Sequence, residues 1–296
     1  MRKSKTIREL IGENVGVINL LPDGLDEVTR LDAEYHAGVR DQWIDLNQID
    51  TARNRKFHGE AIAELARDLR TDAVILELGS GVGYDAKQFL ELNIPFGCYV
   101  VSEIAPALLE HSKEALAPVS AGRQMLYCCL SADNMLIADK EIDRIFAVAT
   151  VHHFPDLRLA LKEIDRVARP GAKIIFALEP NRFWSSILVK LRPVYRRLFA
   201  EKTHSAADED AEGFSLGDLR TMGANFLWQV ERIAPVWFFV GFLHYGLEFA
   251  YRLLRLRKRI SMPTSVEKFL IAADAAFFKI PFCDRLAWHY TIVFKK

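Results

Sequence analysis

Three glycines stand at alternate positions directly after an apolar run. Residues 74–83 read Val-Ile-Leu-Glu-Leu-Gly-Ser-Gly-Val-Gly, and a helical pattern opens after them. Glycine lets the backbone approach a ligand closely and adopt angles closed to other residues. The start of a helix adds free N–H groups and a positive dipole end. Gly79, Gly81 and Gly83 therefore predict a ligand site at the carboxyl end of a buried strand.

The spacing of these glycines separates two classes of nucleotide site. A dinucleotide fingerprint reads GxGxxG and would need a glycine at position 84, where this chain has Tyr84. A nicotinamide-dependent oxidoreductase is therefore disfavoured. The pattern that is present is Glu77-x-Gly79-x-Gly81-x-Gly83, with Ser80 inside the loop.

A second acidic residue ends the next predicted strand. Glu103 follows the apolar run at 98–102, and Pro106 suits the first turn of a helix. A carboxylate at this place can accept two hydrogen bonds from a ribose diol. A solvated charge at a strand end is the alternative, but the position one βαβ unit after the glycine loop favours ribose binding.

Short apolar runs alternate with helical patterns, as expected for a parallel sheet covered on both faces. Strands are predicted at 74–78, 98–102, 125–129, 144–149 and 173–178, helices at 84–92, 106–116 and 157–168, and two further strands near 228–235 and 288–294. The fold class is thus α/β: a Rossmann-like, seven-stranded, mostly parallel sheet. We expect an N-terminal helical lid at 1–73, a cofactor-binding core at 74–180, and a helical insertion and cap with the last two strands at 181–296.

The fourth predicted strand and the residues after it add two further motifs to the glycine loop and Glu103. The first reads Ile-Asp-Arg-Ile-Phe-Ala-Val-Ala-Thr-Val-His-His-Phe-Pro at 142–155, and Arg-Val-Ala-Arg-Pro-Gly-Ala-Lys-Ile-Ile-Phe-Ala-Leu-Glu-Pro follows at 166–180. With the glycine loop and Glu103, residues 74–180 resemble class I S-adenosylmethionine (SAM)-dependent methyltransferases of the small-molecule type, typified by the ubiquinone-pathway enzymes. The ends of the chain match that family only loosely.

The resemblance implies that SAM is the cofactor and that its methyl group faces an acceptor. The methyl group would be transferred by in-line displacement. In the family, an acidic residue after the third strand commonly bonds the adenine amino group beside the preceding backbone amide, which points to Asp133 and Ala132. Asp133 could instead cap a helix or a turn. The residues expected to bind SAM are Glu77, Gly79, Ser80, Gly81, Gly83, Glu103, Ile104, Ala132, Asp133 and Ala149.

Candidates for a general base are few. His152 and His153 follow the fourth strand, where the family builds the wall between cofactor and acceptor, and histidine titrates near neutrality. Either could equally only pack the loop. Tyr35 and His36 are weaker candidates from the N-terminal lid. Asp41, Trp43, Arg53, Arg55 and His58 are further lid residues that helix packing could also explain.

Composition excludes several partners. The 39 basic and 39 acidic residues balance, which argues against a global attraction to nucleic acid. The D/N-P-P-Y/F motif of nucleic-acid base methyltransferases is also absent after the fourth strand. The four cysteines show no metal-ligand spacing, so no metal site is expected. No apolar segment follows the basic start, so a cytoplasmic protein is predicted.

Two segments combine apolar and basic residues. Residues 182–200 carry five basic side chains and no acid, and 233–254 are nearly all apolar and lead into a basic run ending at 259. We expect either a helical cap over the acceptor pocket or peripheral contact with the inner face of a membrane. The sequence leaves open the acceptor atom, and a non-catalytic SAM-binding scaffold is the alternative to an enzyme acting on a small or amphipathic metabolite.

Overall fold

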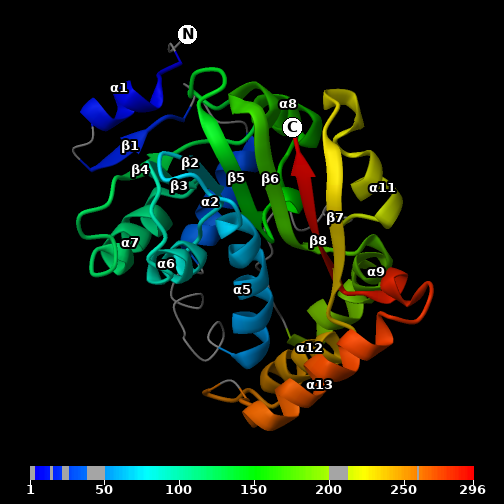
Figure 1. Ribbon diagram of the computed structural model, residues 1–296. Coiled ribbons are helices and arrows are strands. Elements are labelled where there is room, and N and C mark those ends of the chain that lie inside the picture. Colours follow the sequence, from blue (N-terminus) through cyan, green and yellow to red (C-terminus); the bar gives the residue numbers. More distant parts are fainter. Residues whose placement is uncertain (1–3, 14–15, 22–26, 39–50, 200–212, 259) are drawn as a thin grey trace.

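A single eight-stranded sheet forms the centre of the molecule (Figure 1). The computed structural model describes residues 4–13, 16–21, 27–38, 51–199, 213–258 and 260–296. The strand order is β1-β4-β3-β2-β5-β6-β8-β7. Pairing is parallel except where β8 meets β6 and β7. The Rossmann-like α/β fold is therefore confirmed.

The central strands are buried because their residues are apolar on both faces. They are β2 (Val74–Leu78), β3 (Cys98–Glu103), β4 (Met125–Cys129), β5 (Ile142–Val148) and β6 (Ala168–Pro180), followed by β7 (Gln229–Val236) and β8 (His289–Lys295). All five residues of β2 and of β4 are buried. These seven strands lie within a few residues of the predicted ones.

The expected count of seven strands is wrong. An additional short strand, β1 (Val17–Asn19), pairs in parallel with β4 at the edge of the sheet. It lies in the N-terminal stretch expected to be mostly helical. Its three residues are too few to show alternation, and the edge of β4 recruits them through backbone hydrogen bonds such as Leu20 N–H to the Cys129 carbonyl, 2.7 Å.

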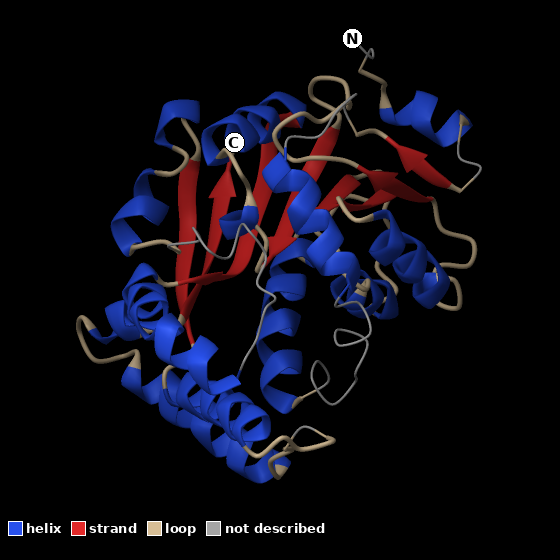
Figure 2. Ribbon diagram, turned by 180° about the vertical axis from the view of Figure 1, so that it is seen from behind, coloured by secondary structure: helices blue, strands red, loops and turns tan. Residues whose placement is uncertain are grey.

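Helices cover both faces of the sheet (Figure 2). One core cluster joins the sheet to α5 (Ala52–Ala66), α6 (Tyr84–Glu91) and α7 (Pro106–Leu116). A second cluster, on the other face, includes α1 (Ile7–Gly12), α8 (Leu157–Val167) and α11 (Leu216–Thr221). Asp156 caps α8 by accepting the backbone N–H of Leu159.

Three further helices gather at one end of the sheet: α9 (Arg182–Phe199), α12 (Phe239–Leu253) and α13 (Thr264–Phe277). The helix α2 (Glu27–Gly38) packs near α7 instead. Val236 and His289 are register partners in the β7–β8 pair. Residues 237–288, which include α12 and α13, therefore leave and re-enter the sheet at one place. Among the described helices, none is both long and apolar enough to cross a bilayer.

The strand order reverses direction beside β2. From β2 the chain proceeds through β3 to β4 on one side, then crosses to β5 and β6 on the other. Such a switch point leaves a crevice outside the carboxyl ends of the two flanking strands. The glycine loop begins there, directly after β2.

Candidate functional site

The glycine loop is fixed by backbone contacts. Gly79, Gly81 and Gly83 have φ values of +66°, +54° and +78°, which favour glycine. A Cβ on Gly79 would lie 2.4 Å from the Thr150 side chain, whereas one on Gly81 would meet nothing within 4 Å. Gly79 is thus required by packing, and Gly81 keeps a space open in front of the loop.

Glu103 ties this loop to the end of β3. Its carboxylate accepts the N–H of Gly81 at 2.9 Å through one oxygen and the N–H of Ile104 at 2.8 Å through the other. Ser112 also donates from its hydroxyl to the Gly81 carbonyl, 2.7 Å. The oxygen bonded to Ile104 also accepts the N–H of Ala105 at 3.3 Å. The oxygen bonded to Gly81 retains a lone pair, so the carboxylate can still accept a hydrogen bond from a ligand.

Glu77 lies behind the loop. Its side chain is 2% exposed and accepts a hydrogen bond from the Tyr99 hydroxyl, 3.0 Å. Burial, together with the neighbouring Asp85 carboxylate, raises the pKa of Glu77 to about 8. Glu77 does not line the cavity in front of the loop. Its hydrogen bond from Tyr99 joins β2 to β3, and its contact with the cofactor stays a prediction.

A cavity of about 460 Å³ opens in front of the strand ends. One half is lined by the glycine loop, the end of β3 and the turn after β4. The other half is lined by α5, the loop after β5, α12 and the start of β8. The predicted cofactor residues in its wall are Gly79, Ser80, Gly81, Glu103, Ile104, Ala132 and Ala149.

Two further predicted cofactor residues stand outside this wall. Gly83 is the N-cap of α6, and a Cβ there would press on Ser112 at 3.2 Å. Asp133 follows the lining residue Ala132 and accepts a hydrogen bond from the Ser131 hydroxyl. The hydrogen bond from Ser131 is thus a local contact within the turn. The contact of Asp133 with adenine stays a prediction.

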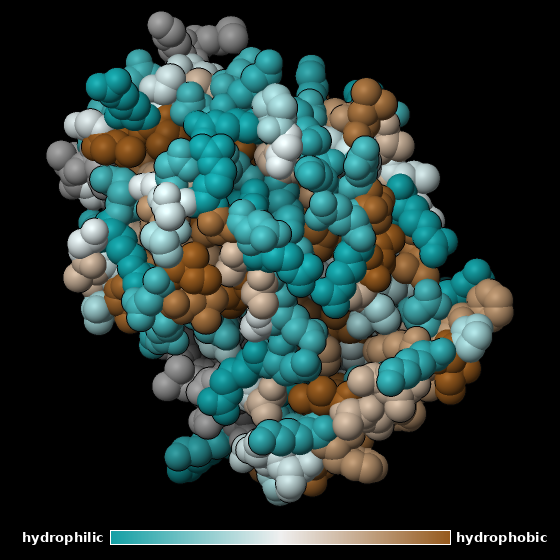
Figure 3. All heavy atoms as spheres, in the orientation of Figure 1, coloured by the Kyte–Doolittle hydropathy of each residue, from teal (hydrophilic) through white to brown (hydrophobic). Residues whose placement is uncertain are grey.

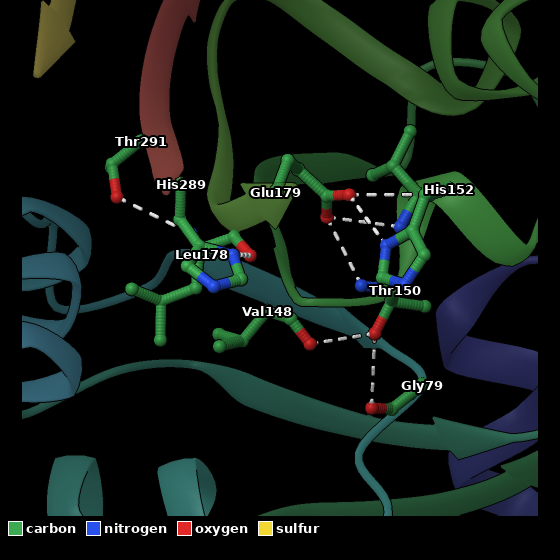
Figure 4. Close-up of polar contacts among 9 residues, drawn as sticks. Gly79, Val148, Thr150, His152, Leu178, Glu179, His289 and Thr291 are labelled. Carbon is green, nitrogen blue, oxygen red and sulfur yellow. Dashed lines mark hydrogen bonds and ion pairs between the residues drawn. The ribbon is translucent and has the colours of Figure 1, made fainter. Parts of the chain in front are cut away.

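Glu179 organises the loop after β5 (Figure 4). Its fully buried carboxylate accepts the backbone N–H groups of Thr150 and Val151, both at 3.0 Å, and of His152 at 3.2 Å. The His152 ring also contacts it through Nδ1 at 2.9 Å. His152 does not line the cavity, so the geometry favours a structural role for this histidine over that of a base.

The other candidate bases differ in position. His153 lines the cavity, and its ring packs on that of His152 with centroids 4.1 Å apart. Tyr35 lies in α2 and does not line the cavity; the side chain of His36 lies outside the described residues, as do Asp41 and Trp43. Of the weaker lid candidates, His58 is in the wall, bonded to Asp85 at 2.7 Å.

Part of the chain matches a known family of protein domains. Residues 76–176 match the family model described as a methyltransferase domain. These residues run from β2 into β6 and include the glycine loop, Glu103 and the loop after β5. The chain carries a class I SAM-dependent methyltransferase domain. S-adenosyl-L-methionine is the cofactor of this family.

Curated relatives of the methyltransferase domain act on different molecules, according to their names. A ubiquinone/menaquinone biosynthesis C-methyltransferase of Hahella chejuensis is 25% identical over 49% of this chain and 58% of its own length. A sterol methyltransferase-like protein of Botryococcus braunii is 28% identical over 48% of this chain and 34% of its own length. A probable tocopherol O-methyltransferase of Oryza sativa is 25% identical over 55% and 46%. The chain thus covers less than two thirds of each of these relatives.

Solved structures show the same fold. A Haemonchus contortus phosphoethanolamine N-methyltransferase in complex with SAM covers 93% of this chain and 60% of its own, with TM-score 0.56 and 14% identity. A putative sarcosine dimethylglycine methyltransferase of Galdieria sulphuraria covers 82% and 85%, with TM-score 0.54 and 15% identity.

Several wall residues of the methyltransferase cavity escaped sequence analysis. Asn54 comes from α5, Trp237, His244 and Tyr245 from the chain between β7 and β8, and His289 from β8 itself. Glu179 was also missed, although its place at the end of a predicted strand, like that of Glu103, was a usable signal. For residues 233–254 a cap over the acceptor pocket was one of two expectations, but their spacing does not show which side chains reach the cavity.

Proposed function

We propose that this protein transfers the methyl group of SAM to a small or amphipathic metabolite. The observation that carries the proposal is a shared cavity: the glycine loop and the helical cap both line it. We call the lining from the glycine loop, the end of β3 and the turn after β4 the cofactor half, and the lining from α5, the loop after β5, α12 and the start of β8 the acceptor half. A cofactor and an acceptor bound in the two halves would meet inside. Enclosure of this kind provides the close, aligned approach that a displacement requires.

The cofactor half suits SAM in shape and chemistry. Gly81 leaves room where a side chain would intrude, and one carboxylate oxygen of Glu103 is available to a ribose hydroxyl. Ile104, Leu108 and Ala132 supply an apolar wall suited to an adenine ring. When bound, the cofactor supplies a methyl group made electrophilic by the sulfonium. The chain itself binds and orients the cofactor and the acceptor, and it excludes water from them.

Calorimetric titration with SAM and S-adenosylhomocysteine tests this assignment. We expect micromolar binding to the wild type, a loss of at least about tenfold in Glu103→Gln, and no change in Glu110→Ala, an exposed carboxylate on α7. Gly81→Arg should abolish binding, with circular dichroism as the check on folding. Absence of binding to folded wild type would refute the proposal. Binding without turnover of any acceptor would instead favour the scaffold alternative.

We further propose that the helical cap contacts a membrane surface peripherally. Among the described residues, 13 of the 18 exposed large apolar side chains belong to α9, α12, α13 or the turns after them. These form the cap surface: Phe183, Leu188, Val189, Leu191, Phe239, Phe242, Phe249, Leu253, Leu254, Leu256, Phe269, Ile280 and Phe282. Figure 3 shows apolar atoms over the α12–α13 region at the lower right, with hydrophilic side chains between them.

Charge favours an anionic bilayer as the occupant of the cap surface. Residues 239–285 contain eight Lys and Arg residues but four Asp and Glu residues, although the chain as a whole is neutral. Two of these acids, Glu267 and Asp274, are buried. Exposed aromatic rings among cations are the pattern of an interfacial surface. The ubiquinone, sterol and tocopherol relatives are consistent with an acceptor that partitions into lipid.

Vesicle flotation tests the membrane proposal. We expect flotation with vesicles containing phosphatidylglycerol, weaker flotation with phosphatidylcholine alone, and loss in Phe269→Ser/Phe282→Ser. Leu227→Ser removes a side chain that is 88% exposed on the turn before β7, outside the cap surface, and should leave flotation unchanged. No flotation at low salt would refute membrane contact, and a concentration-dependent dimer seen by light scattering would assign the cap surface to a second copy.

A further inference from the structure

Tyr245 and His289 form a hydrogen-bonded chain in the acceptor half of the cavity. The Tyr245 hydroxyl lies 3.0 Å from His289 Nε2, and His289 Nδ1 lies 3.0 Å from the Leu178 carbonyl oxygen. A carbonyl only accepts hydrogen bonds, so Nδ1 must carry the ring proton. Nε2 is then the acceptor, and Tyr245 donates its hydroxyl proton to it.

This arrangement fixes what Tyr245 can offer a ligand. Its single proton is directed at His289, so only the lone pairs of its oxygen remain. Packing holds both rings in place: Trp237 lies edge-on to His289 with centroids 5.2 Å apart, and Trp288 packs on Tyr245 at 4.5 Å. A ligand group that meets Tyr245 must therefore be a hydrogen-bond donor.

The charges around the acceptor half are balanced. Asp85 is bonded to His58, and Arg53, whose Nε donates to His244, forms an ion pair with Glu267. Burial lowers the pKa of His289 to about 4, so this imidazole is neutral near pH 7. Among the described residues around this half, Asp85 and Arg53 each contact a partner side chain, so the geometry suits an uncharged acceptor.

We propose that Tyr245 binds the hydroxyl group of an uncharged acceptor and that His289 receives the proton released when this hydroxyl is methylated. This inference rests on the proposed function and specifies its substrate class. Tyr245 acts as a catalytic residue, since it contacts the acceptor. His289 is a positioning residue that acts through Tyr245.

The transfer is balanced in atoms and charge. The acceptor oxygen gains the methyl carbon and loses its proton to the Tyr245 oxygen, while the Tyr245 proton moves to His289 Nε2. The electron pair of the broken carbon–sulfur bond stays on sulfur, giving S-adenosylhomocysteine. The positive charge lost from the sulfonium reappears on the imidazolium. Burial is the largest influence on the pKa of His289 and opposes that imidazolium, whereas the Leu178 carbonyl bonded to Nδ1 and the Glu179 carboxylate favour it.

A pair of shape-matched probes tests the donor requirement. Naphthol carries a hydroxyl, and methoxynaphthalene carries its methyl ether instead. Titrated with and without S-adenosylhomocysteine, naphthol should bind the wild type about fivefold or more tightly than the ether. Tyr245→Phe should abolish this difference. Tyr251→Phe, on the same helix but outside the cavity wall, should preserve it.

Nitrogen-15 NMR of labelled histidine provides a readout independent of any ligand. His289, assigned by comparison with His289→Gln, should show a protonated Nδ1 and an unprotonated Nε2 at neutral pH. Tyr245→Phe should shift the Nε2 resonance, and Tyr251→Phe should not.

A protonated Nε2, or equal binding of naphthol and its ether to the wild type, overturns the inference. Neither result depends on cofactor binding. Failure of S-adenosylhomocysteine to bind would instead count against the proposed function, so the two failures are distinguishable.

Discussion

Arg53 of α5 and Glu267 of α13 form a buried ion pair that joins the N-terminal part of the chain to the helical cap. Their side chains are 8% and 4% exposed, and the Arg53 backbone N–H also donates to Glu267, 3.1 Å. Removing one member of such a pair leaves a buried charge without its partner. The pair thus connects α5, which lines the cavity, to α13 of the helical cap.

Glu267→Ala should lower the free energy of unfolding by about 3–5 kcal/mol, measured by urea denaturation. Glu60→Ala removes an exposed partner of Lys56 on α5 and should change it by less than about 1 kcal/mol. Arg53→Met/Glu267→Leu, which removes both charges, should be more stable than Glu267→Ala. Equal losses of unfolding free energy in Glu267→Ala and Glu60→Ala would show that the buried pair contributes little.

Gly79→Ala should destabilise the protein more than Gly81→Ala. Both substitutions place a Cβ at positive φ, at about 1–2 kcal/mol each. Only Gly79→Ala also drives that Cβ against Thr150, adding about 1–3 kcal/mol. Urea midpoints compare the two. Similar midpoints would mean that Thr150 moves aside.

Glu77 should make stability fall as pH rises. Its pKa is about 8 in the folded protein and near 4.5 when exposed, so the folded state binds the extra proton between these values. The free energy of unfolding should fall by about 3 kcal/mol between pH 5 and pH 8 from this group. Glu77→Gln, which can still accept from Tyr99, should lack this decrease. Parallel pH profiles of variant and wild type would contradict the assignment.

Glu179→Gln should loosen the loop after β5. A neutral amide replaces a carboxylate that accepts three backbone N–H groups and the His152 ring. Hydrogen exchange at Thr150, Val151 and His152 should accelerate at least about tenfold. Amides of β3 serve as the internal control. Unchanged hydrogen-exchange rates would show that the 3-10 turn at Val151–His153 keeps its structure without the carboxylate.

Sequence patterns predicted the sheet well because its strands are apolar on both faces and separated by clear turn signals. β2, β4 and α7 match their predicted bounds. The grouping of Gly79, Gly81 and Glu103 in one cavity wall was foreseen for the same reason, because they lie at strand ends whose order follows from parallel pairing. Their contact with the cofactor stays a prediction.

The acceptor half could not be foreseen from spacing. Tyr245 and His289 are far apart in sequence, and only the return of the chain to β8 places them together. β1 was missed because three residues carry no periodic signal. The hydrogen bond between Glu77 and the Tyr99 hydroxyl could not be foreseen either, because it depends on the pairing of β2 with β3.

The pairing of Val236 with His289 has an evolutionary consequence. Neighbouring antiparallel strands need only a tight hairpin, so residues 237–288 form a cassette whose ends already meet. Such a cassette can diverge, or be exchanged between homologues, without altering the register of the sheet or the glycine loop. Substitutions within this cassette would change Trp237, His244 and Tyr245 of the cavity wall while the strand pairing at both of its ends stays in place.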